Sequence, residues 1–443
     1  GTLAEKTAFG MVKKYLEERG QTASNAEMDR LTQGCVGVRR TTGQHPGGLV
    51  VVPDDMDVED FTAVQHPADD AGSDTITTHF EYHCMEDNLL KLDMLGHDDP
   101  TMIKMLEDLT GVNARAIPLD DPDTMSIFTS SKVLGFENDE VLGPTGAVAI
   151  PEFNTRFTRG MLMDTMPKDF NTLVRLSGFS HGTDVWLGNA RELIVSGTAS
   201  VLETVGCRDD IMLYLISMGL DPKMSFKIME AVRKGKVKKG GFQEGWEEAM
   251  RDHEVPDWYI GSLAKIGYLF PKAHAVAYVM MAFRIAWFKV HEPLAFYATF
   301  FSIRAKAFDA EYCCAGLDAV KQKIKEIENN KDATDVEQNL MVTLEVCYEF
   351  YLRGFHFDTI DIYKSDATRF KITENGLLPP FVTVRGLGET AALDTVEKRK
   401  GKTFISVEEF ANTCSKLSKT HIEQLKALGA FAGMADTSQV SLF

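Results

Sequence analysis

The sequence predicts an α+β protein that is predominantly helical, with a small mixed sheet ahead of a long helical region and a final region of mixed elements. Three observations lead to this prediction. Between residues 37 and 95, apolar residues form short runs or alternate with polar ones, which is typical of strands. From residue 100 to about 304 they recur at helical spacing, and the last hundred residues mix short strands with GLG and LGAF turns.

The first elements are one or two helices over residues 1 to about 36, with a polar turn near Gly20. Strands are expected at 49–52, which stops at Pro53, at 76–82 and at 89–95. A small mixed sheet would result.

The strand at 89–95, LLKLDML, carries an aspartate among leucines. A period of two puts Lys91 and Asp93 on one face and the apolar residues Leu90, Leu92 and Met94 on the other. Because an unpaired carboxylate is costly to bury, we expect the polar face to belong to a site or to a buried ion pair.

Helices dominate after Asp99, which with Pro100 gives an N-cap and first-turn signal. The helical region is interrupted at 120–123, at 181–184 and at a loop rich in Gly and Lys near 236–241. Beyond residue 305 an amphipathic helix leads to a polar link at 329–335. At roughly 150 residues per domain, the 443 residues suggest about three globular units.

Composition narrows the class of protein. With 44% hydrophobic and 25% charged residues, a sizeable core is expected and general disorder is not. Seven cysteines without CxxC spacing favour a reducing cytoplasm. The apolar stretch 275–288 is broken by Arg284 and is too short for a membrane span, and no signal peptide is visible, so no membrane partner is expected. The opening Gly-Thr, which runs straight into a helical pattern, suggests a fragment of a longer protein.

Charge argues against a uniformly basic surface, because the formal net charge is −18. Two local basic runs stand out, at 233–239 and at 398–402. Each run taken alone is most often a solvated face.

The run RRTTGQHPGGLVVVP joins Arg39 and Arg40 to a Gly-Gly turn just before a strand. Glycines let backbone N–H groups approach an anion and arginines neutralise it. The alternative is an ordinary turn with two surface arginines. The phosphate-binding pattern GxxxxGK[ST] is absent.

Two motifs contain residue types found in metal sites and hydrolases, but their spacing and sequence context argue against both kinds of site. His79 and His83 in THFEYH would share a face on a helix, but on a strand they lie about 13 Å apart, too far for one zinc ion. Ser177, His181 and Asp184 in LSGFSHGTDVWLGN lack the nucleophile elbow G-x-S-x-G. A polar loop that faces a ligand is the preferred interpretation of the second motif.

The segment FPKAHAVAY begins a helix at Pro271 and Lys272, with His274 in its first turn. Cationic side chains at a helix N-terminus attract phosphate, and small residues let a flat ligand approach. A buried helix with one satisfied histidine is the competing interpretation.

Two further segments indicate binding. Gly386-Leu387-Gly388 lies between apolar segments ahead of a helix, as in a helix-hairpin-helix, whose N–H groups bind DNA backbone without reading sequence. Residues 417–431 resemble a degenerate second copy, and the run that contains Lys398 and Arg399 lies between the two. The final QVSLF suggests a peptide for a partner's pocket, although a frayed tail is the alternative.

Together these stretches resemble the C-family DNA polymerases, specifically the C-terminal part of the PolC-type alpha subunit of bacterial DNA polymerase III. The segments that carry the resemblance occur in order over nearly the whole chain: GTLAEKTAFG, RRTTGQHPGGLVVVP, NLLKLDMLGHDDPT, SGFSHGTDVWLGNA, GCRDDIM, FPKAHAVAYV and QVSLF. The forms RTTGQHPGG and FPKAHA are more like PolC than like the sister DnaE type.

The resemblance implies the end of a thumb at 1–36, the second half of a palm at 37–99, fingers at 100–304 and a duplex-binding region at 305–443. It also implies that Asp93 is the third catalytic aspartate of the palm, a ligand of two Mg²⁺ ions shared with aspartates outside this chain, and that Lys91 offsets charge beside it. The implied partners are primer-template DNA, dNTP, a sliding clamp and other replisome subunits.

The implied contact residues fall into three groups. Those for the nucleotide are Arg208, Lys272, His274, Ser177, His181 and Phe270. Those for DNA are Arg39, Arg40, Gly386, Gly388, Lys398 and Arg399, and those for the clamp are Gln439, Ser441, Leu442 and Phe443.

The sequence also departs from the family pattern. The expected Asp-x-Asp pair is absent, the acidic stretch at 54–60 is interpreted as a solvated loop, and the basic loop at 236–243 is longer than usual. We therefore expect this chain to be inactive alone. A non-catalytic DNA-binding and clamp-tethering module is the alternative, and a metal-dependent hydrolase built on His79 and His83 requires those residues to be helical.

Overall fold

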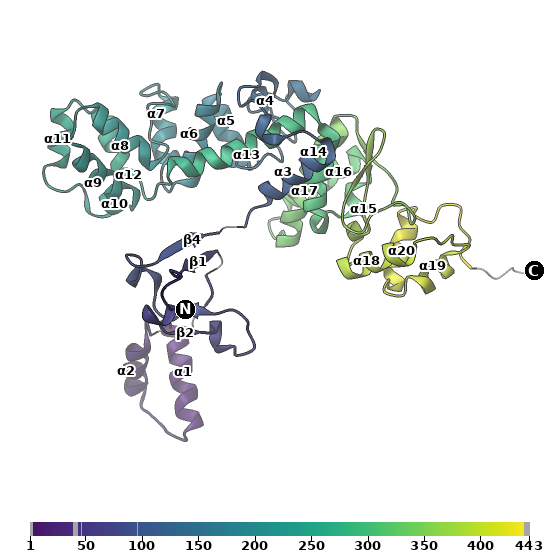
Figure 1. The fold of residues 1–443 in the computed structure, drawn as a ribbon, viewed down its shortest axis with the longest axis horizontal. Coiled ribbons are helices and arrows are strands. Elements are labelled where there is room, and N and C mark those ends of the chain that lie inside the picture. Colours follow the sequence, from purple (N-terminus) through teal and green to yellow (C-terminus); the bar gives the residue numbers. More distant parts are fainter. Residues whose placement is uncertain (1–2, 39–42, 46, 95, 438–443) are drawn as a thin grey trace, which may run out of the picture. The chain divides into compact units, whose positions relative to one another are not determined.

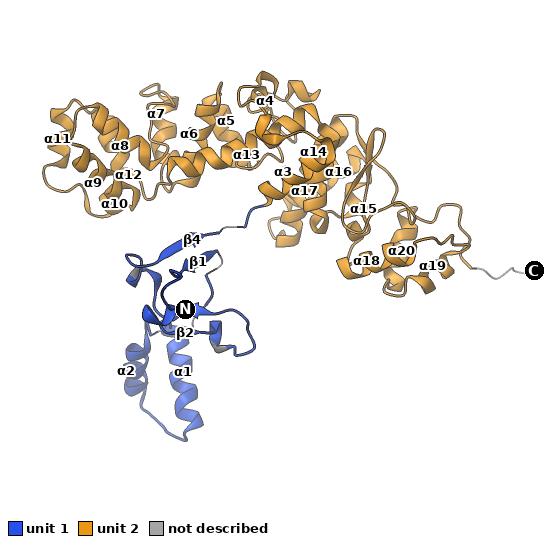
Figure 2. Ribbon diagram, in the orientation of Figure 1, with its two compact units in different colours: residues 1–97 blue, residues 98–443 orange. Residues whose placement is uncertain are grey.

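The computed structural model describes residues 3–38, 43–45, 47–94 and 96–437. The chain divides into two compact units, Gly1–His97 and Asp98–Phe443 (Figure 2). Each unit is described by itself.

The first unit opens with two helices, α1 (Glu5–Glu18) and α2 (Asn25–Cys35), which pack against each other. Ser24 caps α2 by accepting a hydrogen bond from the backbone N–H of Glu27. The strands that follow are β1 (Gly48–Val51), β2 (Val64–Gln65), β3 (Thr77–Thr78) and β4 (Leu90–Asp93).

These strands form two separate antiparallel pairs, β1 with β4 and β2 with β3. The expected single mixed sheet over 37–95 is therefore wrong for the described residues. The strand expected at 76–82 is shorter than predicted, because β3 ends at Thr78 and a 3₁₀ turn, Tyr82–Cys84, begins soon after it.

The second unit is mainly helical (Figure 1). Its first helices are α3 (Asp98–Thr110), α4 (Pro122–Ser126), α5 (Arg156–Thr165), α6 (Phe170–His181), α7 (Arg191–Val195) and α8 (Arg208–Ser217). Next come α9 (Pro222–Arg233), α10 (Lys236–Gly240), α11 (Trp246–Asp252), α12 (Asp257–Lys265), α13 (Lys272–His291) and α14 (Pro293–Ile303). The loop expected near 236–241 is largely the short helix α10, which forms because Val237 is buried in the core.

The remaining elements are α15 (Ala310–Cys313), α16 (Leu317–Asn329), α17 (Asp335–Leu352), β5 (His356–Phe357), β6 (Lys371–Ile372), β7 (Gly376–Leu378), α18 (Glu389–Lys398), α19 (Val407–Thr413) and α20 (Lys419–Ala427). Strand β7 lies between β5 and β6, parallel to the first and antiparallel to the second. A mixed sheet thus exists in this unit. The coarse prediction of a mainly helical chain with small sheets is confirmed.

Helix α13 organises the core of the second unit, where it packs against α3, α4, α6, α8 and α14. By length and mean hydropathy it could cross a membrane. However, Phe283 and Phe288 are fully buried within the unit, and Lys289 is buried in an ion pair with Glu349. These contacts are typical of the core helix of a globular unit.

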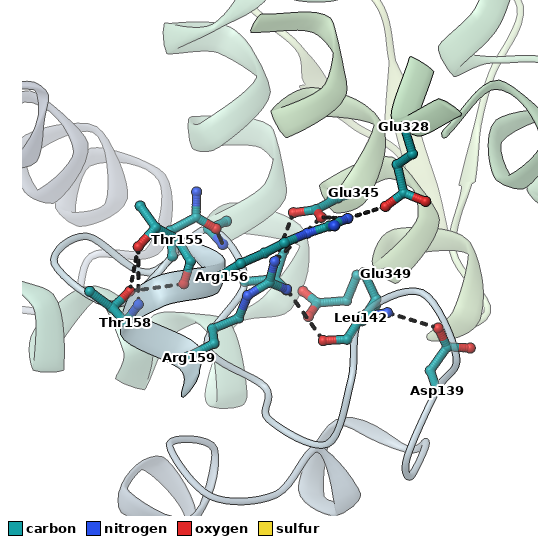
Figure 3. A network of polar contacts seen from close by, with 12 residues as sticks. Asp139, Leu142, Thr155, Arg156, Thr158, Arg159, Glu328, Glu345 and Glu349 are labelled. Atoms are coloured by element: carbon teal, nitrogen blue, oxygen red, sulfur yellow. Dashed lines mark hydrogen bonds and ion pairs between the residues drawn. The ribbon is translucent and has the colours of Figure 1, made fainter. Parts of the chain in front are cut away.

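A polar network connects α5 with α16 and α17 (Figure 3). Arg156 pairs with Glu328 and Glu345, and the guanidinium of Arg159 donates to Glu345 and to the carbonyl of Leu142. Nearby, the ammonium of Lys289 donates to the carbonyls of Gly146 and Val148 and lies 2.7 Å from Glu349 Oε1. The loop at 146–154 is therefore fixed to α13 and α17.

Candidate functional site

Four of the predicted site residues lie together in the second unit, where the C-terminal end of α6 meets the start of α13. The ring of His181 lies 5.7 Å from that of Phe270 and 5.5 Å from that of His274, measured between centroids. The rings of Phe270 and His274 are 5.1 Å apart. Ser177, one turn before His181, is buried beneath them.

Backbone contacts bring these elements together. The backbone N–H of Thr183, just after α6, donates to the carbonyl of Tyr268 over 3.0 Å. Glycine is required at 178, because a Cβ there would lie 2.2 Å from the carbonyl oxygen of Gly206. The segment before α8 can thus pass directly against α6.

The two predicted cations stand at the first positions of α8 and α13. The backbone N–H of Arg208 donates to the carbonyl of Phe270 over 3.1 Å, and that of Lys272 donates to Asp209 Oδ2 over 2.7 Å. Neither cationic side chain has a partner among the described residues, so both can reach an anion. The two helix N-termini add positive potential here, which the carboxylates of Asp209 and Asp210 in the first turn of α8 offset in part.

The sequence interpretation missed Glu152, which completes this cluster. Its carboxylate is buried, accepts a hydrogen bond of 3.2 Å from the Ser177 hydroxyl and forms an ion pair with His181 Nε2. Nothing in the segment AVAIPEFN marks that glutamate, because the contact depends on a loop that folds back onto α6.

The pair shifts the pKa values of both partners. The hydrogen bond with Glu152 raises the pKa of His181 above its ordinary value, and burial opposes this only in part. For Glu152, burial acts to raise the pKa, but hydrogen bonds from His181 and Ser177 and the nearby charge hold it below its ordinary value. The cluster thus favours an imidazolium beside a carboxylate.

Asp93 lies in the first unit, on β4 opposite Gly48 of β1. Its carboxylate is 2.9 Å from the ammonium of Lys91, and its side chain is 60% exposed. The ion pair between Lys91 and Asp93 exists, but the alternative that it is buried is wrong, because the two-stranded pair leaves the Asp93 carboxylate exposed to solvent. The side chain of Lys91 also lines a cleft with His45 and His79.

The described residues hold no group of three or more His, Cys, Asp or Glu side chains that could bind a metal ion. His79, considered for zinc, lies outside any helix and its Nδ1 is 2.7 Å from Gln65 Oε1. The condition for the hydrolase interpretation, a helix through 79–83, is therefore not met.

Three family models match the chain. The bacterial DNA polymerase III alpha NTPase domain matches residues 3–96, the bacterial DNA polymerase III alpha subunit finger domain matches 99–254, and a helix-hairpin-helix motif matches 354–440. The chain is also 56% identical to the PolC-type DNA polymerase III of Caldanaerobacter subterraneus, 52% to that of Halalkalibacterium halodurans and 53% to that of Bacillus cereus. Each of these alignments covers the whole chain.

The chain belongs to the PolC-type DNA polymerase III family. It spans about 31% of the length of these relatives. This percentage does not say which part of the relatives the chain matches, so it does not confirm the prediction that the chain is their C-terminal part.

The helix-hairpin-helix has the expected glycines. Gly386 has φ of 77°, in the left-handed region, and Gly388 is the N-cap of α18. Leu387 between them is buried, whereas both glycines are exposed. The hairpin therefore places two exposed glycines at the start of a helix, the position at which backbone N–H groups bind phosphate.

The two cations at the C-terminal end of α18 differ in how far their charges are available to a ligand. Lys398 remains partly exposed and pairs with Asp394. Arg399 is 8% exposed, donates to the backbone carbonyls of Ile362 and Ser365 and covers the ring of Phe381. The prediction that Arg399 contacts DNA is therefore wrong, because its guanidinium is used inside the fold.

Several predicted residues lie outside the described ranges. These are Arg39, Arg40, Gln439, Ser441, Leu442 and Phe443. Their roles remain predictions from sequence.

Proposed function

We propose that the chain is part of a replicative DNA-directed DNA polymerase, which transfers a nucleotide from dNTP to the primer 3′ hydroxyl. The observation that supports this most is identity above 50% over the whole chain to three PolC-type DNA polymerase III proteins. The cluster around His181 and His274 also agrees with this proposal, because its aromatic rings and neighbouring cations suit a nucleotide.

In this proposal the cluster binds the incoming nucleotide. Arg208 and Lys272 neutralise the triphosphate, aided by the N-termini of α8 and α13. Phe270 and His274 offer ring faces to the nascent base pair, and Ser177 and His181 shape the pocket from α6.

Asp93 fits as one ligand of Mg²⁺, because it is an exposed carboxylate oxygen donor. It does not fit as a whole site, since no three-ligand group exists among the described residues. The remaining carboxylates would come from elsewhere in the complete polymerase. Bound Mg²⁺ would supply charge neutralisation and activation of the primer hydroxyl. Lys91 would hold the orientation of Asp93 and offset negative charge.

The regional assignments follow the same proposal. Residues 1–36 would end a thumb, 37–99 would form half of a palm, 100–304 the fingers and 305–443 a duplex-binding region. The hairpin at Gly386 and Gly388, with Lys398, would contact the primer-template backbone. The QVSLF segment would bind a sliding clamp, and other replisome subunits would join the enzyme in the cytoplasm.

The decisive experiment replaces Asp93 by Asn in a complete polymerase that carries this segment. Loss of a metal ligand should reduce primer extension by about a hundred-fold or more, without loss of binding to primer-template DNA. Asp87→Asn, at an exposed carboxylate with no ion pair to any residue that the structure describes, is the matched control and should retain activity. Full activity of the Asp93→Asn enzyme would contradict the proposed role.

A second candidate is a non-catalytic module that binds DNA and tethers the clamp. The helix-hairpin-helix match and the lack of a three-ligand group among the described residues favour it. This 443-residue chain alone should bind primer-template DNA yet give no template-dependent synthesis under either proposal. The Asp93→Asn enzyme separates the two, because a module would tolerate the change.

A further inference from the structure

The contact between Glu152 and His181 leaves one imidazole nitrogen available. Nε2 is held by Glu152 Oε2, whereas Nδ1 has no partner among the described residues. The His181 side chain is 34% exposed and that of Glu152 only 6%. The carboxylate is therefore buried behind the ring, and the free nitrogen belongs to the partly open side chain.

The loop that carries Glu152 is strained. Glu152 has φ of 70° and Ala149 has φ of 63°, both in the left-handed region that non-glycine residues seldom adopt. Such strain persists only where surrounding contacts enforce it, and it is concentrated at functional sites.

Specific contacts enforce this loop conformation. The backbone N–H of Ala149 donates to Asn154 Oδ1 over 2.6 Å. The ammonium of Lys289 donates to the carbonyls of Gly146 and Val148, and it is itself held by Glu349. A buried charge thus anchors the loop that delivers the carboxylate to His181.

The other groups around His181 are neutral or cationic apart from Asp209, whose carboxylate accepts a hydrogen bond from the backbone N–H of Lys272 at the start of α13. Phe270 and His274 face its ring, and Tyr268 and Tyr278 extend the aromatic wall. The cations Arg208 and Lys272 begin the two neighbouring helices. Ser177 donates to the same carboxylate oxygen as His181. Glu152 is the carboxylate found in contact with the ring.

We propose that Glu152 is a positioning residue that holds His181 as an imidazolium, with Nδ1–H presented to a phosphate oxygen of the bound nucleotide. This inference rests on the proposed nucleotide-binding function of the cluster. It predicts that Glu152 never touches the ligand, although it controls the charge and orientation of a group that does. The physical basis is that a buried carboxylate stabilises the protonated ring and fixes which nitrogen remains free.

The first test measures the ionisation of His181 in the 443-residue chain. Histidine ring signals, assigned with a His181→Gln variant, are followed by NMR over pH 5 to 9. The pKa of His181 should lie above its ordinary value and should fall in Glu152→Gln. Glu374→Gln, at an exposed glutamate that forms no ion pair within the described part of the chain, should leave the pKa of His181 unchanged. An unraised pKa in the unaltered chain overturns the proposal, whether or not the variant folds.

The second test measures binding of inorganic tripolyphosphate by calorimetry across the same pH range. Loss of one charge-assisted hydrogen bond should weaken binding roughly ten-fold near neutral pH in Glu152→Gln, and the pH midpoint of the affinity should move down with the His181 pKa. Glu152→Asp, which keeps a carboxylate, should restore part of the affinity. A variant that melts earlier yet keeps the affinity and its pH midpoint would show a merely structural role and would overturn the proposal.

These readouts separate this inference from the proposed function. If the tripolyphosphate result holds while a complete polymerase carrying the segment fails to extend primers, the proposed function fails and the role of Glu152 stands. If primers are extended but Glu152→Gln changes neither measurement, the role of Glu152 fails alone.

Discussion

The two units of the chain differ in how far they bury their apolar side chains. In the second unit, α13 and α17 are enclosed by other helices of the same unit, and residues such as Phe283 and Phe350 are fully buried. In the first unit, the β1–β4 pair carries its apolar side chains at the surface. The second unit therefore has a core of its own, whereas the strand pair of the first unit has almost none.

Strand register explains the exposure in the first unit. Leu49 is paired with Leu92, and Val51 with Leu90, so all four side chains lie on one face of the ribbon. They are 39–63% exposed. A two-stranded ribbon is at best marginally stable in water, and an apolar face this exposed adds little to the stability of the first unit. The difference teaches that periodicity fixes which residues share a face, but not whether that face is buried.

The largest effect is expected from Glu349→Ala in the second unit. The change leaves the ammonium of Lys289 fully buried without its carboxylate and should cost about 3–5 kcal/mol of unfolding free energy. Burial already lowers the pKa of Lys289 to about 8, so the ammonium is still the main form at pH 7. Urea denaturation checks this, with the exposed Glu374→Ala as control. A loss no greater than that of the control would mean that the network in Figure 3 and the adjacent Lys289 pair do not hold the unit together.

Matched leucines test the comparison directly. Leu263→Ala removes a fully buried side chain from α12 and should cost about 2–5 kcal/mol in the second unit. Leu92→Ala, at a position 42% exposed, should cost the first unit less than about 1 kcal/mol. Denaturation followed by hydrogen-exchange mass spectrometry measures each unit separately. Equal losses of unfolding free energy for the two variants would contradict this difference between the units and would show that the β1–β4 pair is buried in solution.

The smallest effect is the pH dependence of the Glu152–His181 pair. The raised pKa of His181 gives stability that is complete below its ordinary value of 6.5 and is lost as pH rises through the folded value. The lowered pKa of Glu152 gives stability that is present above 4.5 and is lost as pH falls through the folded value.

The difference in unfolding free energy between the unaltered chain and the Glu152→Gln variant should therefore be largest between pH 4.5 and 6.5. We expect about 1 kcal/mol, because His181 is a third exposed and solvent screens the pair. A difference that grows above pH 8 would contradict the assigned sign.

Local signals in the sequence located many elements correctly. The pair Asp99-Pro100 marks the first turn of α3, Pro271-Lys272 marks the start of α13, and Pro53 follows β1 within two residues. The glycines of the GLG turn and the helix after it were also predicted. Such features depend on caps, proline geometry and period, all of which act within a few residues.

The site was predicted only in part. Ser177, His181, Phe270 and His274 were singled out from motifs, and the structure brings them together. Glu152 was missed and Arg399 was misassigned, because one is delivered by a distant loop and the other is withdrawn into the fold.

The sequence by itself determined the helical class, the family and the local chemistry of each motif, because these follow from residue type and short-range spacing. Only the tertiary structure decided which charges are available. Long-range packing buries the guanidinium of Arg399 and the ammonium of Lys289, leaves Asp93 open to solvent and sets Glu152 behind His181. Burial and partner depend on contacts between residues far apart in the chain, and no local pattern encodes them.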